Sequence, residues 1–340
     1  MLQYFGVDRR GVASLACVAL LVMGCGAGAP VGETGVTAAV SGLRPIVDVG
    51  AGAAMLVISG VTGSFQNPCY SPDGKTLVFT VFADRYNVGE ANVWAVDAAG
   101  GAVRRRLSSP GAQSVNLPGK CIAHGGDMAV FASDAGGSDQ IYIVSVAGGT
   151  PVAVTDISAG LATEPSASPR LVDASRWIVF ESRRSDTGPG ELWKIRVDGG
   201  GLTRLTSGAD DRQPQWSPAG DRIAFQRRLG DDWDVWTIAP DGTEAVDVSA
   251  NATTEDTDPS WSPDGRCIVY SSNGPGVALA DLFVIRAGGG PRIQITHGRG
   301  LGGAPGWSPD GQTIAFESAP IDPDLSSNTA IWSTPAPASC

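Results

Sequence analysis

The chain has 340 residues, enough for about two average domains or for one large all-β domain. Hydrophobic residues make up 42%, which excludes disorder over most of the length, and 46 glycines with 23 prolines predict many turns. The formal net charge of −11 argues against a nucleic-acid-binding protein, because phosphate recognition needs a basic surface. No apolar run reaches the roughly 18 residues of a membrane-spanning helix, so a polytopic membrane protein is excluded as well.

The N-terminal segment has the pattern of an export signal. A basic pair, Arg9-Arg10, precedes an uncharged and mostly apolar run with the length of a signal-peptide core. The run ends in a small residue before a cysteine, Gly24-Cys25, which resembles the lipobox of bacterial lipoproteins. Val22 departs from that family, which usually has leucine at this position.

The lipoprotein resemblance implies removal of residues 1–24 and lipidation of Cys25. Residues 25–54 would then form a flexible tether on an outer-membrane anchor that faces the periplasm or the cell surface. No aspartate follows the cysteine, which favours outer-membrane sorting in proteobacteria. Ordinary secretion, with cleavage near residues 27–29, is the alternative. Both interpretations place the protein outside the cytoplasm.

The body of the chain is a repeat. An aromatic-Ser-Pro-x-Gly turn begins at Tyr70, Trp216, Trp261 and Trp307, and two degenerate copies, near Ile122 and Ser168, fill the gap between the first two. Successive copies are about 45 to 52 residues apart, close to the length of a four-stranded propeller blade. The proline and glycine suit a type I turn with a left-handed corner, and the aromatic side chain is expected to pack between neighbouring blades.

Each copy continues with the same sequence of strands. A β-rich run comes first, an aliphatic–aromatic pair comes second, and a glycine-rich hairpin leads to a short strand ending in Ser or Thr. The pattern resembles the TolB-type β-propeller repeat over about residues 55–334, followed by a tail at 335–340. The resemblance implies an all-β, six-bladed propeller of four-stranded antiparallel blades around a channel that binds a protein or ligand at one mouth.

The two ends of the repeat region predict how the ring closes. The sixth copy ends near Thr334 and lacks its outermost strand, while residues 55–59 have the position and apolar character of that strand. We therefore expect residues 55–59 to pair beside 330–334, because closure removes an exposed sheet edge.

Motifs for catalysis, metals and cofactors are missing from the sequence. It has no G-x-S-x-G elbow, H-E-x-x-H pair or Walker loop, and the only histidines are His124 and His297. TolB-like pectin lyases use a cluster of histidines to bind metal, which this chain cannot supply. The sequence thus predicts no catalytic residues, no cofactor and no metal ligand set.

The candidate recognition residues lie around an x-Pro dipeptide that recurs in five copies. These positions are expected to precede the innermost strand of each blade and to ring one mouth of the channel, together with nearby charged residues. The predicted partner-binding residues are Asn67, Glu164, Asp211, Arg212, Gln213, Asp256 and Asp258. An acidic rim suits a basic peptide or a cation. The alternative is that these polar residues only solvate a loop.

A second polar ring precedes each aliphatic–aromatic pair, at Asn92, Gln140, Glu191, Asp234 and Asp281. Its regularity favours a structural role, in hydrogen bonds within the hairpin between the middle strands. Cys69 and Cys121 occupy equivalent positions in the first two copies. A disulfide between them and a pair of buried free thiols are both open, with the free thiols favoured.

Two function classes follow. The first is a non-enzymatic, monomeric cell-envelope scaffold that binds a protein or peptide at a channel mouth and touches the membrane through its lipid anchor alone. The second is a glycan-acting hydrolase or lyase that uses carboxylates such as Glu164, Asp211 and Asp258. The missing motifs favour the scaffold, although a fold by itself does not decide function.

Overall fold

The computed structural model describes most of the chain between residues 55 and 339. The described ranges are 55–56, 63–84, 86–98, 105–112, 115–116, 121–157, 160–185, 187–250, 253–273, 280–297, 302–318 and 329–339. The predicted signal peptide (1–24), the tether (25–54) and Cys340 lie outside them. In this part of the chain no helix is long and apolar enough to cross a membrane.

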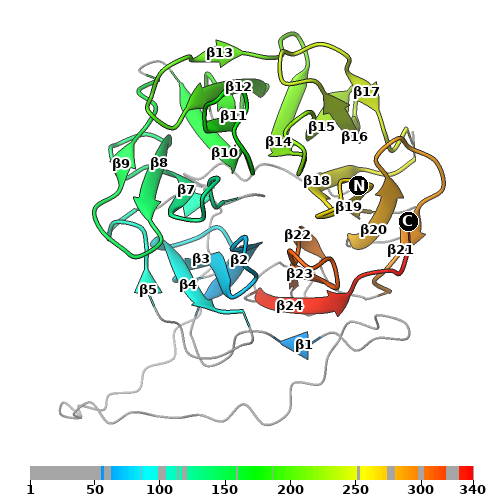
Figure 1. The fold of residues 1–340 in the computed structure, drawn as a ribbon, viewed down its shortest axis with the longest axis horizontal. Coiled ribbons are helices and arrows are strands. Elements are labelled where there is room, and N and C mark those ends of the chain that lie inside the picture. The colour runs from blue at the N-terminus through cyan, green and yellow to red at the C-terminus, as the bar shows by residue number, and fades with distance from the viewer. Residues whose placement is uncertain are drawn as a thin grey trace, which may run out of the picture.

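Twenty-four strands form six antiparallel four-stranded sheets, arranged as blades around a central axis (Figure 1). Blades 1 and 2 contain β2 (Ser64–Tyr70), β3 (Thr76–Phe82), β4 (Ala91–Asp97), β5 (Arg105–Arg106), β6 (Val115–Asn116), β7 (Met128–Ser133), β8 (Gln140–Ser145) and β9 (Val152–Ala153). Blades 3 and 4 contain β10 (Leu161–Ala167), β11 (Trp177–Arg183), β12 (Glu191–Arg196), β13 (Thr203–Arg204), β14 (Asp210–Trp216), β15 (Ile223–Leu229), β16 (Asp232–Ile238) and β17 (Val246–Asp247).

Blade 5 contains β18 (Asp256–Trp261), β19 (Cys267–Ser272), β20 (Asp281–Arg286) and β21 (Ile293–Gln294). Blade 6 contains β22 (Gly303–Trp307), β23 (Thr313–Ser318), β24 (Ala330–Pro335) and, from the other end of the chain, β1 (Met55–Leu56). Within each blade the first strand is the innermost one, and in blade 6 that strand is β22. The predicted six-bladed, all-β propeller is therefore confirmed.

The ring closes as the sequence predicts. Strand β1 pairs antiparallel with β24, with Met55 opposite Ser333 and Leu56 opposite Trp332, and completes the sheet order β1-β24-β23-β22. The remaining residues of the predicted strand, 57–59, lie outside the described ones. The outer edge of the last blade is thus covered by the start of the propeller region.

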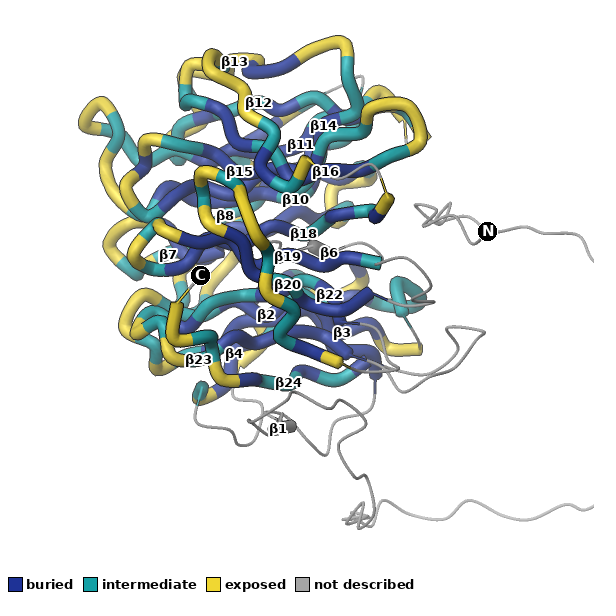
Figure 2. The backbone as a smooth tube through the Cα atoms, turned by 90° about the vertical axis from the view of Figure 1, so that its right-hand side faces the viewer, coloured by how far each residue is buried: buried dark blue, intermediate teal, exposed yellow. Residues whose placement is uncertain are grey.

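The core lies between the blades. The aromatic residue in the second strand of every blade is almost fully buried: Phe79, Phe131, Phe180, Phe225, Tyr270 and Phe316. Two of the tryptophans that begin the turn motif bridge neighbouring blades: the indole N–H of Trp261 donates to the carbonyl of Gln215 and that of Trp307 to the carbonyl of Ser260, each at 3.2 Å. Exposed residues concentrate in the connecting turns (Figure 2).

The turns have the predicted chemistry. In the first copy, Ser71 donates to the Asp73 carboxylate at 2.7 Å, and the N–H of Lys75 donates to the same oxygen at 3.1 Å. The glycine that follows adopts a left-handed conformation, with φ of 70° at Gly74 and similar values in the other three complete copies. A residue with a Cβ atom would be strained there.

The second polar ring is structural, but its hydrogen bonds run elsewhere than predicted. Asp281 accepts a hydrogen bond from the hydroxyl of Thr296 at 2.8 Å, and that hydroxyl accepts the backbone N–H of Leu282 at 2.8 Å. The same arrangement joins Asn92 to Ser108, and Gln140, Asp234 and their hydroxyl partners repeat it. These four members therefore link the third strand to the second residue after the fourth, rather than to the middle hairpin. The fifth member, Glu191, lies 3.6 Å from Arg204 of the fourth strand.

Candidate functional site

The x-Pro residues lie inside the innermost strands, not before them as predicted. At each dipeptide the pairing with the second strand shifts register, which is a β-bulge. The residue before proline takes a left-handed conformation, with φ between 44° and 54°, at Asn67, Glu164, Gln213, Asp258 and Ala304. Such backbone is costly for residues other than glycine, so the surrounding structure must hold it in place.

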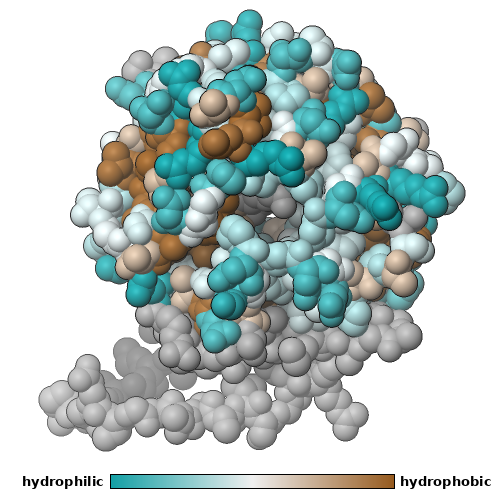
Figure 3. All heavy atoms as spheres, in the orientation of Figure 1, coloured by the Kyte–Doolittle hydropathy of each residue, from teal (hydrophilic) through white to brown (hydrophobic). Residues whose placement is uncertain are grey.

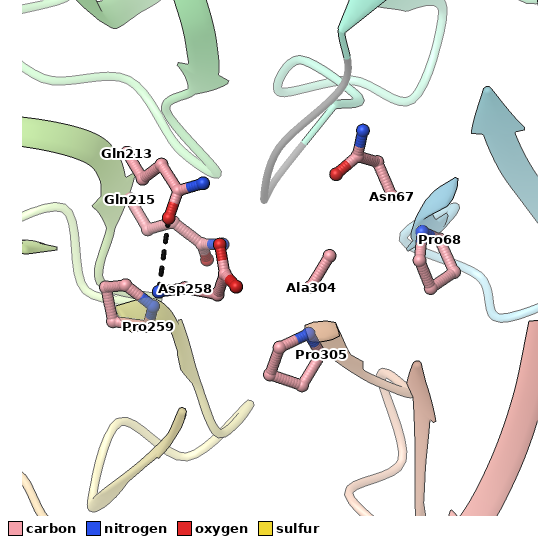
Figure 4. A pocket seen from close by; sticks show the side chains of 8 residues that line it. All are labelled: Asn67, Pro68, Gln213, Gln215, Asp258, Pro259, Ala304 and Pro305. Atoms are coloured by element: carbon pink, nitrogen blue, oxygen red, sulfur yellow. Dashed lines mark hydrogen bonds between the residues drawn. The ribbon is translucent and has the colours of Figure 1, made fainter. Parts of the chain in front are cut away.

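The bulges from several blades meet at the centre of the ring. A cavity of about 10 Å³, close to the space of one water molecule, is lined by Asn67, Pro68, Gln213, Gln215, Asp258, Pro259, Ala304 and Pro305. Figure 4 shows the side chains of Asn67, Gln213 and Asp258 pointing toward this shared space. The side-chain oxygen of Gln213 accepts the backbone N–H of Asp258 at 3.1 Å. We call this ring the constriction.

The bulges of blades 1 and 5 are held by a side chain of the blade before them. The N–H of Asp258 also donates to the side chain of Gln226 at 3.0 Å, and the N–H of Asn67 donates to the carboxyl of Glu317 at 3.1 Å. Gln226 and Glu317 each come directly after the buried aromatic residue of the second strand in their blade. Glu181 occupies the same position in blade 3. Sequence reasoning missed this third ring because its members differ in charge and size from blade to blade.

Two carboxyl groups at the constriction are hard to ionise. Burial raises the pKa of Asp258, and hydrogen bonds to Gln213 and to the backbone of Ala304 offset only part of that effect. Burial, followed by the charge of Asp258, raises the pKa of Glu317 to about 8. Because both raised pKa values favour the neutral acids, the constriction carries less negative charge than the predicted acidic rim.

Two of the predicted rim residues, Asp211 and Arg212, form ion pairs within blade 4. Asp211 is fully buried and accepts two hydrogen bonds from Arg227, at 2.6 and 2.8 Å. Arg212 forms a similar pair with Asp210, at 2.7 and 2.8 Å. Asp211 and Arg212 thus serve the packing of blade 4, and the structure does not place them together with Asn67 on one rim.

Asp256 and Glu164 complete the predicted set. Asp256 is fully buried and accepts hydrogen bonds from the hydroxyls of Ser272 at 2.6 Å and Thr254 at 3.0 Å, with Arg292 at 3.5 Å. Burial raises its pKa. Glu164 is half-buried at the bulge of blade 3. Of the seven predicted residues, Asn67, Gln213 and Asp258 therefore meet at the constriction.

A wider pocket, which we call the funnel, is lined by residues that follow the bulges of blades 1, 5 and 6 and by the Ser-Pro turns. Its volume is about 710 Å³, and all six blades contribute to its wall. The wall is mostly apolar and aromatic, with Tyr70, Trp261 and Trp307 beside a set of turn prolines, Pro72, Pro169, Pro218, Pro263 and Pro309. Figure 3 shows the propeller face-on, hollowed at its centre. The funnel has the size of a site for a short peptide or a drug-sized molecule.

One wall of the funnel carries a disulfide. Cys69, which lines the funnel, is bonded to Cys121, with their Cα atoms 6.1 Å apart. The favoured expectation of free thiols is therefore wrong: adjacent innermost strands come close enough to be bridged. The bond joins blade 1 to blade 2, whose turn motif is degenerate. Cys267 is disulfide-bonded as well.

The histidines do not converge with other ligand types. His124 lies in the turn of blade 2, where its Nδ1 is 3.0 Å from the carbonyl oxygen of Pro169. His297 is exposed after the last strand of blade 5. Within the described ranges, no group of three or more His, Cys, Asp and Glu side chains has the geometry to hold a metal ion.

Sequence comparisons agree with this architecture. The family profile PD40, TolB beta propeller domain, matches residues 130–280, which span most of blades 2 to 5. The chain is a TolB-like β-propeller protein.

An uncharacterized protein of Agrobacterium fabrum is 29% identical over 215 residues, covering 59% of this chain and 67% of that protein. The Tol-Pal system protein TolB of Francisella tularensis is 26% identical over 210 residues, covering 61% of this chain and 46% of TolB. The match thus spans about half the length of the TolB relatives.

Solved structures share the fold. A putative TolB from Agrobacterium tumefaciens superimposes with a TM-score of 0.59 at 20% identity, covering 81% of this chain and 91% of that one. TolB from Acinetobacter baumannii gives 0.58 at 16% identity, covering 81% and 64%. An oligogalacturonate lyase in complex with manganese gives 0.53 at 17% identity, covering 82% and 90%. At these identities the likeness concerns architecture alone.

Proposed function

We propose that this TolB-like propeller is a non-enzymatic scaffold of the cell envelope that binds a protein or peptide partner in the funnel. The observation that carries the proposal is the funnel itself, about 710 Å³ of mostly apolar and aromatic wall that narrows to the constriction. A partner segment that buries aromatic and proline surface there gains affinity without charged contacts. Relatives named as Tol-Pal system proteins support a role in an envelope assembly.

Three of the residues predicted from the sequence contribute to this proposal. Asn67, Gln213 and Asp258 line the constriction, where we expect them to offer polar groups to the tip of a segment inserted from the funnel. The constriction has space for about one water molecule, so a partner chain stops there rather than passing through the ring. Asp211, Arg212 and Asp256 support the wall from inside the blades.

The glycan-cleaving alternative is disfavoured by the same geometry. An acid–base pair needs two carboxyl groups that reach one substrate bond. The carboxylate of Asp211 is buried against Arg227, and Asp258 lies where about one water molecule fits. Neither has the access that a sugar chain requires.

Export and lipidation at Cys25 complete the proposed setting. The basic pair, the apolar core and the Gly24-Cys25 junction motivate them. We expect metabolic labelling with palmitate to mark the wild-type chain and to disappear in a Cys25→Ala variant. A label that persists in the variant contradicts lipidation at this residue and leaves secretion without an anchor.

The binding role is tested by crosslinking from the funnel in intact envelopes. We expect one defined product from funnel positions and none from the outer circumference of the propeller. If no product forms from the funnel positions, the proposal that a partner binds in the funnel is wrong.

A further inference from the structure

Blade 3 carries an insertion in its Ser-Pro turn. In the complete turns the serine is closed against the residue five positions later, as Ser262 and Cys267 show with two hydrogen bonds of 2.9 Å in blade 5. In blade 3 the same two hydrogen bonds join Ser168 to Trp177, nine positions later, at 2.8 and 2.9 Å. The turn of blade 3 is therefore four residues longer. We call residues 170–176 the blade 3 hairpin.

The inserted residues form a hairpin of their own with a strained corner. Val172 and Ser175 exchange two backbone hydrogen bonds, at 2.9 and 3.0 Å. Between them Asp173 and Ala174 both take a left-handed conformation, with φ of 50° and 58°. Two such residues in succession make the type I′ corner of a tight hairpin, which glycine would adopt without strain. Backbone strain of this kind is concentrated at functional sites, so the hairpin calls for a functional explanation.

Both neighbouring blades hold the hairpin in place. The guanidinium of Arg170 donates to the carbonyl of Pro218 in the turn of blade 4, at 2.9 Å. The guanidinium of Arg176 donates to the Asp127 carboxylate in the turn of blade 2, at 3.0 Å. The hairpin is thus fixed at both of its ends before any partner arrives, and a fixed surface loses little conformational entropy on binding.

The hairpin belongs to an apolar surface at this end of blade 3. Leu171 is 52% exposed, and the carbonyl of the next residue, Val172, accepts the indole N–H of Trp177 at 3.0 Å. Leu202 is 49% exposed and follows Gly201, where a Cβ atom would lie 3.0 Å from the same indole. The neighbours of both leucines thus contact one tryptophan. Figure 3 shows apolar side chains gathered over β11 and β12, beside the central hollow.

This surface adjoins the funnel. Pro169, directly before the hairpin, lines the funnel, and its carbonyl oxygen lies 3.0 Å from the Nδ1 of His124, another residue of the funnel wall. The charged groups around the two leucines are of both signs: Arg170, Lys194, Arg196, Asp173 and Asp198. Because these charges nearly balance, burial of apolar area is the main interaction that the surface offers.

The hairpin also breaks the regularity of the ring. Within the described residues, the complete Ser-Pro turns of blades 1, 4, 5 and 6 have one length and the same closing hydrogen bonds. A partner that touched these similar turns alone could seat itself in several rotations about the propeller axis. A contact on blade 3 selects one of them.

We propose that the blade 3 hairpin is a second contact site for the partner that enters the funnel, and that Leu171 packs against an aliphatic or aromatic side chain of that partner. The inference rests on the proposed function, because it requires a partner in the funnel. It adds the kind of partner, a protein segment whose apolar side chains continue beyond the funnel across blade 3.

The first test places a photoreactive residue at Leu171 in the full chain, in intact envelopes. Leu229 is the matched control, because it is 53% exposed and ends β15, a strand that starts at the Ser-Pro turn of blade 4 and leads to the opposite end of that blade. We expect position 171 to give the same crosslinked product as a photoreactive residue at Tyr70, and position 229 to give none.

The outcomes of this test separate the two proposals. A product from Tyr70 with none from Leu171, or with a different one, overturns the second contact and leaves binding in the funnel intact. The same product from Leu229 as from Leu171 also overturns it. The absence of any product from Tyr70 and Leu171 rejects both proposals together.

A second test changes the hairpin and reads the product from Tyr70. Leu171→Asp should lower its yield about tenfold, because a carboxylate replaces one buried aliphatic contact. Leu229→Asp should leave the yield unchanged, and both variants should keep the Tm of the wild type, since both side chains are exposed. A yield that Leu171→Asp does not change overturns the proposal.

Removing the hairpin provides an independent variant. The three residues Asp-Gly-Arg of the blade 5 turn, in place of residues 170–176, restore the length of the complete turns. This exchange should lower the yield from Tyr70 at least as far as Leu171→Asp does. An exchanged chain that folds and gives the wild-type yield contradicts a contact on blade 3.

Discussion

Replacing Asp211 by alanine should lower the free energy of unfolding by about 3–5 kcal/mol, because it leaves a buried guanidinium without its partner. Asp211 is fully buried and holds Arg227 through two short hydrogen bonds from the facing position of the neighbouring strand. Arg227 is 15% exposed and lies over the rings of Phe225 and Trp236, so it cannot easily turn toward water. Urea unfolding followed by fluorescence measures the loss.

A matched control comes from the end of β15 and the turn that follows it in blade 4. Arg228 pairs with Asp231 at 3.2 Å, but the Asp231 side chain is completely exposed. Asp231→Ala should therefore cost less than about 1 kcal/mol. If Asp211→Ala costs no more than Asp231→Ala, the buried pair does not support blade 4 as the geometry indicates.

Removing the disulfide between blades 1 and 2 should cost about 4 kcal/mol, the chain-entropy value for a closed loop of this size. Cys69 and Cys121 are separated by 52 residues. The bond ties Cys121, next to the bridge pair of Ile122 with Ala129 of β7, to the innermost strand β2 of blade 1. The Cys69→Ala/Cys121→Ala variant should unfold at lower urea concentration, with the earliest amide exchange in blade 2.

Reduction provides the control for this variant. A thiol reductant should destabilise the wild type by a similar amount, and the double variant corrects for any effect of reducing the bond at Cys267. Free thiols at Cys69 and Cys121, found by mass mapping of non-reduced peptides, would contradict the bridge. So would a double variant as stable as the oxidised wild type.

The repeated parts of the fold were predictable from the sequence. A turn such as Trp261-Ser262-Pro263-Asp264-Gly265 has one physical solution, since proline and a left-handed glycine fix the corner and the tryptophan needs an apolar wall. Six copies in register make the blades, and the missing strand after Thr334 identifies Met55–Leu56 as its replacement. Local chemistry thus determines both the blade and the closure.

The candidate site was predictable only in part. The x-Pro positions stand out in the sequence, but their place inside the innermost strand depends on a bulge that the second strand imposes. By charge and spacing alone, Asp211, Asp256 and Asp258 are equivalent candidates. In the structure Asp211 and Asp256 are buried within their blades, whereas Asp258 faces the channel. Which side of a strand a residue faces next to a bulge depends on tertiary pairing.

The residues that accept the N–H groups of the bulges were also hard to find from the sequence. Gln226 and Glu317 hold equivalent backbone N–H groups, but an amide and a carboxyl look unrelated in the sequence. The signal that finds them is positional, because each follows the buried aromatic of the second strand. Applied to every copy of the repeat, that positional rule identifies Glu317 as a buried carboxyl from its place in the sequence.

Photo-crosslinking in intact envelopes tests the binding role most directly. A photoreactive residue replaces Tyr70 or Pro309 in the funnel wall, and Val152, which is 60% exposed on the outer strand β9, serves as the control position. The account predicts one defined crosslinked partner from both funnel positions and none from Val152. Equal crosslinking from all three positions, or none from the funnel, would contradict a partner that binds in the mouth of the propeller.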